Sequence, residues 1–273
     1  MSGFLKRSWL GVFVLMGLSL HAAEIQDVKI PASKMGRSVS ATVILPDSYK
    51  SSSTERFPVL YLLHGAGDSN QKWNKETNIA ELADQYKMIV ICPNAGRTSW
   101  YFDSPIDPKF QYETFVAKDC VKYMDKHYRT KADRQHRALC GNSMGGHGAL
   151  YLAIRHLDTF ATAVSLSGGV DIRPFAGKWK IARRLGSKKK YPEVWEKNTV
   201  INLAKNLKKG QLAISMDVGD HDFFLKVNRA LDKQLTKDGI KHNYEEHPGA
   251  HGWDYWRLAI KRQMPFIDKQ FKK

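Results

Sequence analysis

The stretch with the clearest chemical potential is Gly-Asn-Ser-Met-Gly at residues 141–145. A serine with a glycine two residues away on each side is typical of a nucleophile elbow, a sharp turn between a strand and a helix. Apolar residues 138–140 predict the strand before the turn, and residues 145–152 predict the helix after it. Glycines suit such a turn because neighbouring backbone comes too close for side chains. Ser143 is the candidate nucleophile; the alternative is a surface serine on a structural turn.

A carboxylate that orients a catalytic histidine is expected just after a late strand. Residues 211–218 predict such a strand, and Gly-Asp-His-Asp follows at 219–222. Asp222 is the preferred acid because it lies at the mouth of the next predicted helix, while Asp217 and Asp220 remain alternatives. The same cluster could be interpreted as a metal site. It lacks a second group of histidines, so we expect no metal.

The general base is expected after the acid in the chain order serine, acid, histidine. His251 lies in the glycine-containing loop 248–252, between predicted strand 241–247 and predicted helix 253–271. His247, on the strand, is the alternative. A serine hydroxyl becomes nucleophilic when a neutral imidazole takes its proton, which predicts an acyl-enzyme that water then hydrolyses.

The small-residue loop His-Gly-Ala-Gly-Asp at 64–68 follows the continuously apolar strand predicted at 57–63. Such a loop suits an oxyanion hole, in which two backbone N–H groups stabilise the charge of the tetrahedral intermediate. Ala66 and Met144 are the candidate donors. His64 is interpreted as a structural brace of the loop rather than as a base.

Three aromatic residues are candidates for substrate binding. Trp100 and Tyr101 lie in the aromatic loop 96–105, beyond a predicted strand, where α/β proteins bind ligands. The alternative is that both rings pack this loop against the protein. Trp253, just beyond the histidine loop, is the third candidate.

Segment 171–210 differs in composition, being rich in Lys and Arg without a clear strand. We predict that it forms a small cap over the site, within the same domain. Basic groups facing the cleft would favour anionic substrates, whereas a solvated outer face would have no such effect.

The N-terminal residues 1–23 have the order of a secretory signal peptide. Lys6 and Arg7 precede an apolar run at 9–20, and Ala22 and Ala23 offer cleavage sites. The run is too short to span a bilayer comfortably, so we expect no stable membrane insertion after cleavage. The remaining residues, 24–273, are predicted to form one catalytic domain that is secreted or periplasmic.

Composition limits the remaining possibilities. The net charge is +16, or about +14 after signal removal, but no nucleic-acid recognition motif accompanies it, and we expect no nucleic-acid partner. The three cysteines argue against a disulfide framework. Cys140, just before the elbow, is expected to be packing rather than a nucleophile.

The pattern of elements predicts the α/β class, with a mostly parallel central sheet and helices on both faces. Further strands are expected at 39–45, 88–92 and 160–166. Further helices are expected at 73–85, 113–128 and 223–236.

These pieces together resemble the esterase D-like (putative esterase) branch of the α/β-hydrolases. That branch includes S-formylglutathione hydrolases, bacterial feruloyl and acetyl-xylan esterases, and antigen 85 mycolyltransferases. The resemblance covers about residues 39–271. The segments that carry it are Leu62–Gly65, Ser99–Tyr101, Tyr112–Thr114, Gly141–Leu150, Gly219–Phe223 and His251–Trp253.

The resemblance implies the α/β-hydrolase fold and no cofactor. It also implies Ser143 as nucleophile, Asp222 as acid and His251 as base, with Ala66 and Met144 as oxyanion donors. The function expected is a secreted serine carboxylesterase for short-chain or aromatic acyl esters, with sugar hydroxyls as the preferred alcohols.

Three alternatives remain. An acyltransferase would use the same site, and a thioesterase similar to S-formylglutathione hydrolase would act in the cytosol, which the signal peptide disfavours. A non-catalytic binder of anionic glycans would not need the three site residues. The sequence leaves the substrate and the oligomeric state open.

Overall fold

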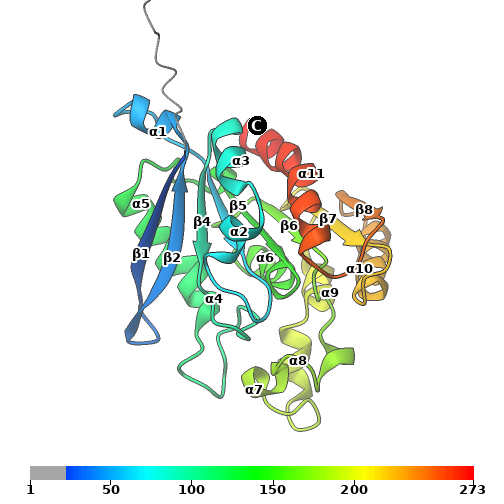
Figure 1. Ribbon diagram of the computed structural model, residues 1–273. Coiled ribbons are helices and arrows are strands. Elements are labelled where there is room, and N and C mark those ends of the chain that lie inside the picture. Colours follow the sequence, from blue (N-terminus) through cyan, green and yellow to red (C-terminus); the bar gives the residue numbers. More distant parts are fainter. Residues whose placement is uncertain (1–22) are drawn as a thin grey trace, which may run out of the picture.

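The structure, a computed structural model, describes residues 23–273. The predicted signal peptide, apart from Ala23, lies outside the described residues. An eight-stranded sheet forms the centre of the molecule, in the order β1-β2-β4-β3-β5-β6-β7-β8 (Figure 1). The strands are β1 Glu24–Ala32, β2 Arg37–Leu45, β3 Val59–Leu63, β4 Ile89–Pro93, β5 Arg137–Asn142, β6 Thr162–Leu166, β7 Ala213–Gly219 and β8 His242–His247.

The sheet is parallel from β4 to β8, while β2 runs antiparallel to both β1 and β4. Strands β3, β4, β5 and β6 are buried at every residue, which explains the continuous apolar sequences of β3 and β4. The edge strand β1 instead alternates in exposure along most of its length. These features confirm the expected α/β-hydrolase fold.

Helices cover both faces of the sheet. Residues of α2, α3 and α11 pack into the apolar layer on one face, and residues of α5, α6 and α10 pack into the layer on the other. The α-helices are α1 Ser48–Ser51, α2 Lys72–Glu76, α3 Ile79–Gln85, α4 Tyr112–Thr114, α5 Val121–His127, α6 Met144–Arg155, α7 Ile181–Leu185, α8 Pro192–Lys197, α9 Val200–Leu203, α10 Leu225–Lys237 and α11 Trp253–Phe271.

Two predicted helices differ from the single regular helices expected. The helix predicted at 73–85 is divided into α2 and α3 because Thr77 adopts an extended conformation and ends α2. The helix predicted at 113–128 contains a π-helical segment, Phe115–Cys120, between α4 and α5. Apolar spacing does not reveal either change, since both depend on local backbone geometry.

Segment 171–210 contains α7, α8 and α9 with 3₁₀ turns at Arg173–Phe175 and Ala204–Asn206, and no strand. Figure 1 shows α7 and α8 at the bottom of the view, beyond the sheet. The guanidinium of Arg184 pairs with Asp107 at 2.8 Å, and its carbonyl accepts a hydrogen bond from the Ser104 hydroxyl. The segment is thus fastened to the loop that follows β4.

No helix within residues 23–273 combines the length and the apolar character that a bilayer crossing requires.

Candidate active site

Ser143 occupies the turn between β5 and α6 with a φ of 56° and a ψ of −116°. This conformation is uncommon for a residue with a side chain. The glycines on either side are required by space. A Cβ at Gly141 would lie 2.6 Å from the backbone of Gly145, and a Cβ at Gly145 would collide with the carbonyl of Leu63. The predicted elbow is therefore present as a packed, tightly constrained turn.

The structure brings Ser143, His251 and Asp222 together. Ser143 Oγ lies 2.8 Å from His251 Nε2, and His251 Nδ1 lies 2.8 Å and 3.0 Å from the two carboxylate oxygens of Asp222. Because a carboxylate only accepts hydrogen bonds, Nδ1–H donates to Asp222 and the serine hydroxyl can donate to Nε2. This arrangement can transfer the serine proton to the imidazole during nucleophilic attack.

Asp222 is well placed to orient the imidazole. Its carboxylate is fully buried, and Oδ1 also accepts a hydrogen bond from the N–H of Phe224 at 2.7 Å. The His251 side chain is 12% exposed, so the ring reaches the cleft. The carboxylate is therefore held by two hydrogen-bond partners behind an imidazole that faces the cleft.

The rival aspartates contact other groups. Asp217 is fully buried and accepts hydrogen bonds from Arg262 at 2.9 Å and 3.0 Å, and from the Tyr255 hydroxyl. It therefore fastens α11 to β7. Asp220 accepts a hydrogen bond from the N–H of Gly249 at 2.9 Å, which fixes the loop that carries His251.

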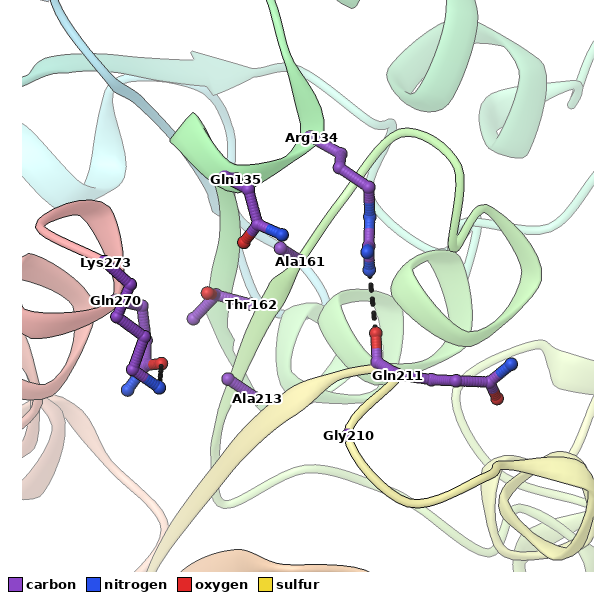
Figure 2. Close-up of a pocket in the computed structure, with 9 residues that line it drawn as sticks. All are labelled: Arg134, Gln135, Ala161, Thr162, Gly210, Gln211, Ala213, Gln270 and Lys273. Carbon is purple, nitrogen blue, oxygen red and sulfur yellow. Dashed lines mark hydrogen bonds between the residues drawn. The ribbon is translucent and has the colours of Figure 1, made fainter.

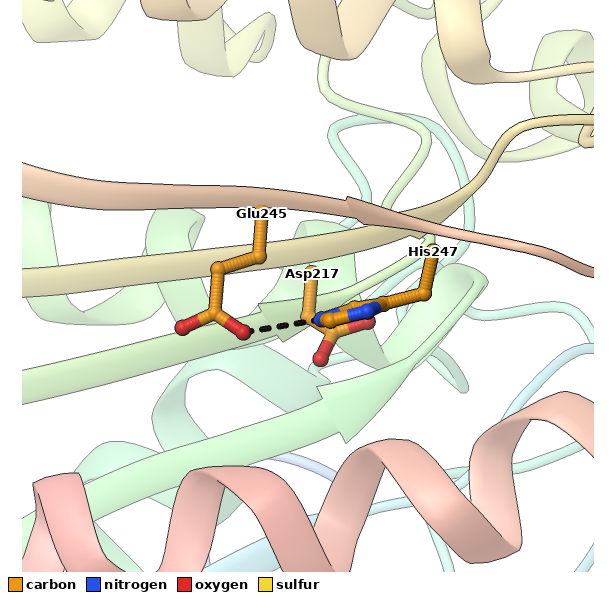
Figure 3. Close-up of side chains that lie close together, drawn as sticks. All are labelled: Asp217, Glu245 and His247. Atoms are coloured by element: carbon orange, nitrogen blue, oxygen red, sulfur yellow. Dashed lines mark hydrogen bonds and ion pairs between the residues drawn. The ribbon is translucent and has the colours of Figure 1, made fainter.

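The rival base, His247, belongs to another group of side chains. Figure 3 shows His247 with Asp217 and Glu245, and its Nε2 lies 3.0 Å from a Glu245 oxygen. A cation placed among these three residues would compete with the Arg262 guanidinium for the Asp217 carboxylate. The group is thus explained as an extension of the ion pair between β7 and α11.

The loop after β3 lies beside Ser143. A Cβ at Gly65 would be 3.5 Å from the Cβ of Ser143, and Ala66 lines the same cleft. His64 Nε2 accepts a hydrogen bond from the N–H of Ala95 at 3.0 Å, and Nδ1 lies 2.8 Å from the Gly65 carbonyl. Burial lowers the pKa of His64 to about 4, so a neutral ring braces this loop from inside the protein.

A cleft of about 410 Å³ opens above Ser143. Its walls contain small residues of the β3 loop, the serine and histidine of the site, and four aromatic rings. The lining residues are Gly65, Ala66, Asp68, Ser143, Trp179, Phe223, His251, Gly252, Trp253 and Trp256.

Of the three aromatic residues predicted to bind substrate, the structure places Trp253 in the cleft wall. Trp100 and Tyr101 are not in that wall, because they are 1% and 0% exposed. Positive φ angles of 55° and 62° turn this part of the loop inward. The Tyr101 hydroxyl donates to the His64 carbonyl at 2.9 Å. Both rings therefore pack behind the site, as the alternative interpretation proposed.

Sequence reasoning missed three aromatic residues of the cleft. Phe223 directly follows Asp222, and Trp256 lies one helical turn after Trp253. Their positions next to predicted site residues were usable signals. Trp179 had no comparable signal, because it reaches the site from segment 171–210, far from any motif.

The thiols and the His147 ring, which lies behind the site, are not available for chemistry. All three cysteines are buried and free, and burial raises the pKa of Cys140, which keeps its thiol protonated. Burial also lowers the pKa of His147 to about 3, so this ring, packed against Trp100 and Tyr151, stays neutral.

A second cavity, of about 370 Å³, lies at the opposite end of the sheet, where β6 and β7 begin (Figure 2). Thr162 and Ala213 mark those strand starts, and Arg134 donates a hydrogen bond to the Gln211 carbonyl at 2.7 Å. No serine, cysteine or histidine lines it. The cavity therefore lacks the pairing of a serine or cysteine with a histidine that is present in the cleft above Ser143.

Comparison with known proteins agrees with this geometry. The sequence model of the family described as Putative esterase matches residues 32–267. An acetyl esterase of Caldicellulosiruptor saccharolyticus is 29% identical over 232 residues, which cover 81% of this chain and 86% of that protein. Esterase Rv1288 of Mycobacterium tuberculosis is 29% identical over 262 residues, covering 85% of this chain and 57% of its own length.

Among solved structures, a ferulic acid esterase superposes with a TM-score of 0.78 at 28% identity, covering 91% of this chain and 98% of that one. The family match spans nearly the whole described domain and includes the elbow, the acid turn and the histidine loop. By sequence and by fold, this chain belongs to the putative esterase family and is a carboxylic ester hydrolase.

Proposed function

We propose that the protein is an exported serine carboxylesterase that acts on short-chain or aromatic acyl esters of carbohydrates, with Ser143, His251 and Asp222 as its catalytic residues. The observation that carries this proposal is the continuous chain of hydrogen bonds from Ser143 Oγ through the His251 ring to the Asp222 carboxylate. The three groups come from distant parts of the sequence and meet at one end of the parallel strands.

The reaction begins when Ser143 Oγ attacks the ester carbonyl carbon and His251 Nε2 accepts the serine proton. Asp222 stabilises the imidazolium and keeps Nδ1 as the donor. His251 then donates its proton to the leaving alkoxide oxygen, which leaves an acyl-enzyme. A water molecule, deprotonated by the same imidazole, hydrolyses the acyl-enzyme and restores the serine.

The tetrahedral oxyanion would be stabilised by the N–H groups of Ala66 and Met144. Neither N–H group donates a hydrogen bond within the part of the chain that the structure describes. Met144 also begins α6, where the helix dipole favours negative charge. Each donor of this kind is worth on the order of 3 kcal/mol of transition-state stabilisation.

The substrate class follows from the cleft and from the relatives. Trp179, Phe223, Trp253 and Trp256 supply an apolar wall that suits an acyl chain or ring. Two of the similar proteins carry the names acetyl esterase and ferulic acid esterase, which supports acetyl and aromatic acyl groups. Export, predicted from residues 1–23, would give the enzyme access to polymeric carbohydrate esters.

The decisive test is Ser143→Ala in the mature protein. We expect kcat for p-nitrophenyl acetate to fall by about 10⁴-fold or more, with the thermal unfolding temperature nearly unchanged. Brief reaction of the wild type at low pH should leave an acetyl group on the peptide that contains Ser143, detected by mass spectrometry. Unchanged turnover in folded Ser143→Ala would refute the proposal.

Adding acceptor alcohols separates hydrolysis from acyl transfer, since both reactions pass through the same acyl-enzyme. We expect free acid to remain the main product when glycerol or a methyl pentoside is added. New esters of the added alcohol as the main product would instead assign the protein to the acyltransferases.

A further inference from the structure

We infer that Trp179 and Phe223 form a platform that binds a flat ring of the substrate beside Ser143, and that Trp100 is the positioning residue that holds Trp179 in place. This inference rests on the proposed function, because it assigns the part of the substrate that the catalytic cleft selects.

The platform is defined by two rings in the cleft wall. The Trp179 and Phe223 rings are stacked, with centroids 5.6 Å apart and planes 20° apart. The Phe223 ring centroid lies 4.0 Å from that of the His251 ring. Phe223 is nevertheless 51% exposed, although it follows the buried Asp222 directly. A half-exposed aromatic surface next to the base offers a substrate ring both a stacking face and apolar burial.

Trp179 is held by its backbone as well as by its ring. Trp179 and Lys180 have φ angles of 43° and 58°, which are uncommon for residues with side chains and persist only where the surroundings enforce them. The Trp179 ring also packs against Phe175 and Phe224, at centroid distances of 5.6 Å and 5.3 Å. The carbonyl of Trp179 accepts a hydrogen bond from Trp100 Nε1 at 3.3 Å.

Trp100 is itself fixed to the nucleophile elbow. The backbone N–H of Trp100 lies 3.3 Å from Met144 Sδ, and the centroid of its ring lies 5.4 Å from that of the His147 ring on α6. The ring also lies against Gly169, where a Cβ would be 2.8 Å from it. A series of contacts therefore runs from the elbow through buried Trp100 to the wall of the cleft. This gives Trp100 a role at a position that substrate does not reach.

The ring that binds could belong to either half of the ester. An aromatic acyl group presents a flat apolar face, and the carbon-bound hydrogens of a pyranose alcohol present a similar one. Three substrates distinguish these sources: ethyl acetate, which has no ring, methyl cinnamate, with a ring in the acyl group, and a triacetylated methyl xyloside, with a ring in the alcohol.

The experiment compares Trp179→Ala and Trp100→Phe with the wild type on these substrates. We expect Trp179→Ala to raise KM for at least one of the two ring-bearing esters, the one whose ring binds the platform. The increase should be about 5- to 10-fold relative to the effect on ethyl acetate, since stacking contributes about that factor. Trp100→Phe keeps a buried, smaller aromatic ring but removes the indole N–H. It should raise the same KM about 3-fold, with kcat nearly unchanged.

Trp195→Phe is the matched control. Trp195 is buried in segment 171–210, which also contains Trp179. Its indole N–H donates to the Gly186 carbonyl at 3.0 Å, but the residue does not line the cleft. This variant loses the same kind of hydrogen bond. It should therefore lower the unfolding temperature about as much as Trp100→Phe while leaving every KM unchanged. Equal KM changes in both variants would make the Trp100 effect merely structural.

A double-variant cycle tests the order of the contacts. If Trp100 acts through Trp179, adding Trp100→Phe to Trp179→Ala should raise KM no further, because the group it positions is gone. Fully additive effects would overturn the positioning role. Trp179→Phe should restore most of the lost affinity by keeping a stacking ring.

Two further outcomes separate this inference from the proposed function. Normal KM for both ring-bearing esters in Trp179→Ala, with ethyl acetate still hydrolysed, would overturn the platform and leave the esterase standing. Failure of the wild type to hydrolyse any of the three esters would overturn both.

Discussion

Three aspartates lie between residues 217 and 222, and each has a different partner. Asp217 contacts Arg262 on α11, Asp220 contacts the Gly249 N–H, and Asp222 contacts His251. Asp220 also lies 2.6 Å from Nδ1 of the exposed His221, but the imidazole beside Asp222 is the one whose other nitrogen reaches the Ser143 hydroxyl. The other two stabilise the strand end and the loop around the site, so their substitution should have different consequences.

Asp222→Asn should lower kcat by about 10⁴-fold, because an amide can hydrogen-bond to the wrong tautomer of His251. The measurement is steady-state kinetics on p-nitrophenyl acetate, with the circular dichroism spectrum compared with that of the wild type. Retention of more than a tenth of wild-type kcat in a folded variant would mean that another group orients the base.

Asp217→Asn should have the opposite profile. It leaves the Arg262 guanidinium without its buried charged partner, so the free energy of unfolding should fall by about 2 kcal/mol or more. The kcat of the molecules that remain folded should stay within a few-fold of the wild type. Urea titration and kinetics below the transition provide the two readouts. A large loss of kcat without loss of stability would contradict this assignment.

At the scale of elements, a buried carboxylate joins the α4–α5 region to α6. Glu113 accepts hydrogen bonds from Tyr151 at 2.7 Å, Arg155 at 2.8 Å and His156 at 3.0 Å. Burial alone would raise the pKa of Glu113, but the hydrogen bonds from His156, Arg155 and Tyr151 outweigh it and set the pKa at about 2. The charged form thus stabilises the packing of these helices on the sheet.

This depressed pKa predicts a defined acid sensitivity. A carboxyl group with a lower pKa in the folded state contributes stability above its ordinary pKa of 4.5, and that contribution is lost as the pH falls towards about 2. Glu113→Gln should be less stable than the wild type at neutral pH. The difference should shrink between pH 4.5 and pH 2 when unfolding free energies are measured by urea titration. A constant difference across this range would contradict the prediction.

The elements that could be predicted from sequence are those that depend on local pattern. Continuous apolar runs predict β3 and β4. The glycines around Ser143 predict the elbow, because a residue with a Cβ at either position would collide with neighbouring backbone. The role of Trp100 and the contribution of Trp179 depend on how the loop after β4 packs against segment 171–210. The spacing of residues within either stretch does not predict this contact, because it forms only when the two stretches pack together in the folded chain.

At the scale of the whole molecule, the positive charge is concentrated in part of the chain. Segment 171–210 contains twelve basic and three acidic residues. Arg173 and Arg184 are paired with acids, whereas exposed lysines at 178 and 180 flank Trp179. A field of one sign around a cleft raises the local concentration of substrates with the opposite charge.

This charge predicts a salt-dependent preference. The kcat/KM for acetyl groups on an acidic polysaccharide should fall as NaCl rises from about 10 mM to about 500 mM, because the screening length drops several-fold. The kcat/KM for ethyl acetate should change little. A double variant, Lys178→Gln with Lys180→Gln, should reduce the salt dependence for the acidic polymer. Identical salt profiles for both esters would place the basic groups outside the substrate path.

The proposed export of the protein leads to a second prediction, which concerns processing of the N-terminus and location in the cell. Expression of the full chain in a bacterium with a periplasm should yield a processed protein outside the cytoplasm, beginning at Ala23 or Glu24 by N-terminal sequencing. Replacing Leu15 in the apolar run by Arg should leave unprocessed protein in the cytoplasm. Accumulation of the unaltered full-length chain there would contradict the proposed localisation.

The attachment of segment 171–210 has an evolutionary consequence. The segment leaves the sheet after β6 and returns before β7, so its two ends are fixed by neighbouring strands, while its interior is joined to the loop after β4 through Arg184 and Trp179. It contributes Trp179 to the cleft but none of the proposed catalytic residues. Substrate preference can therefore diverge through changes in one continuous segment, provided that its contacts with Trp100 and Asp107 in the loop after β4 are kept or change with it.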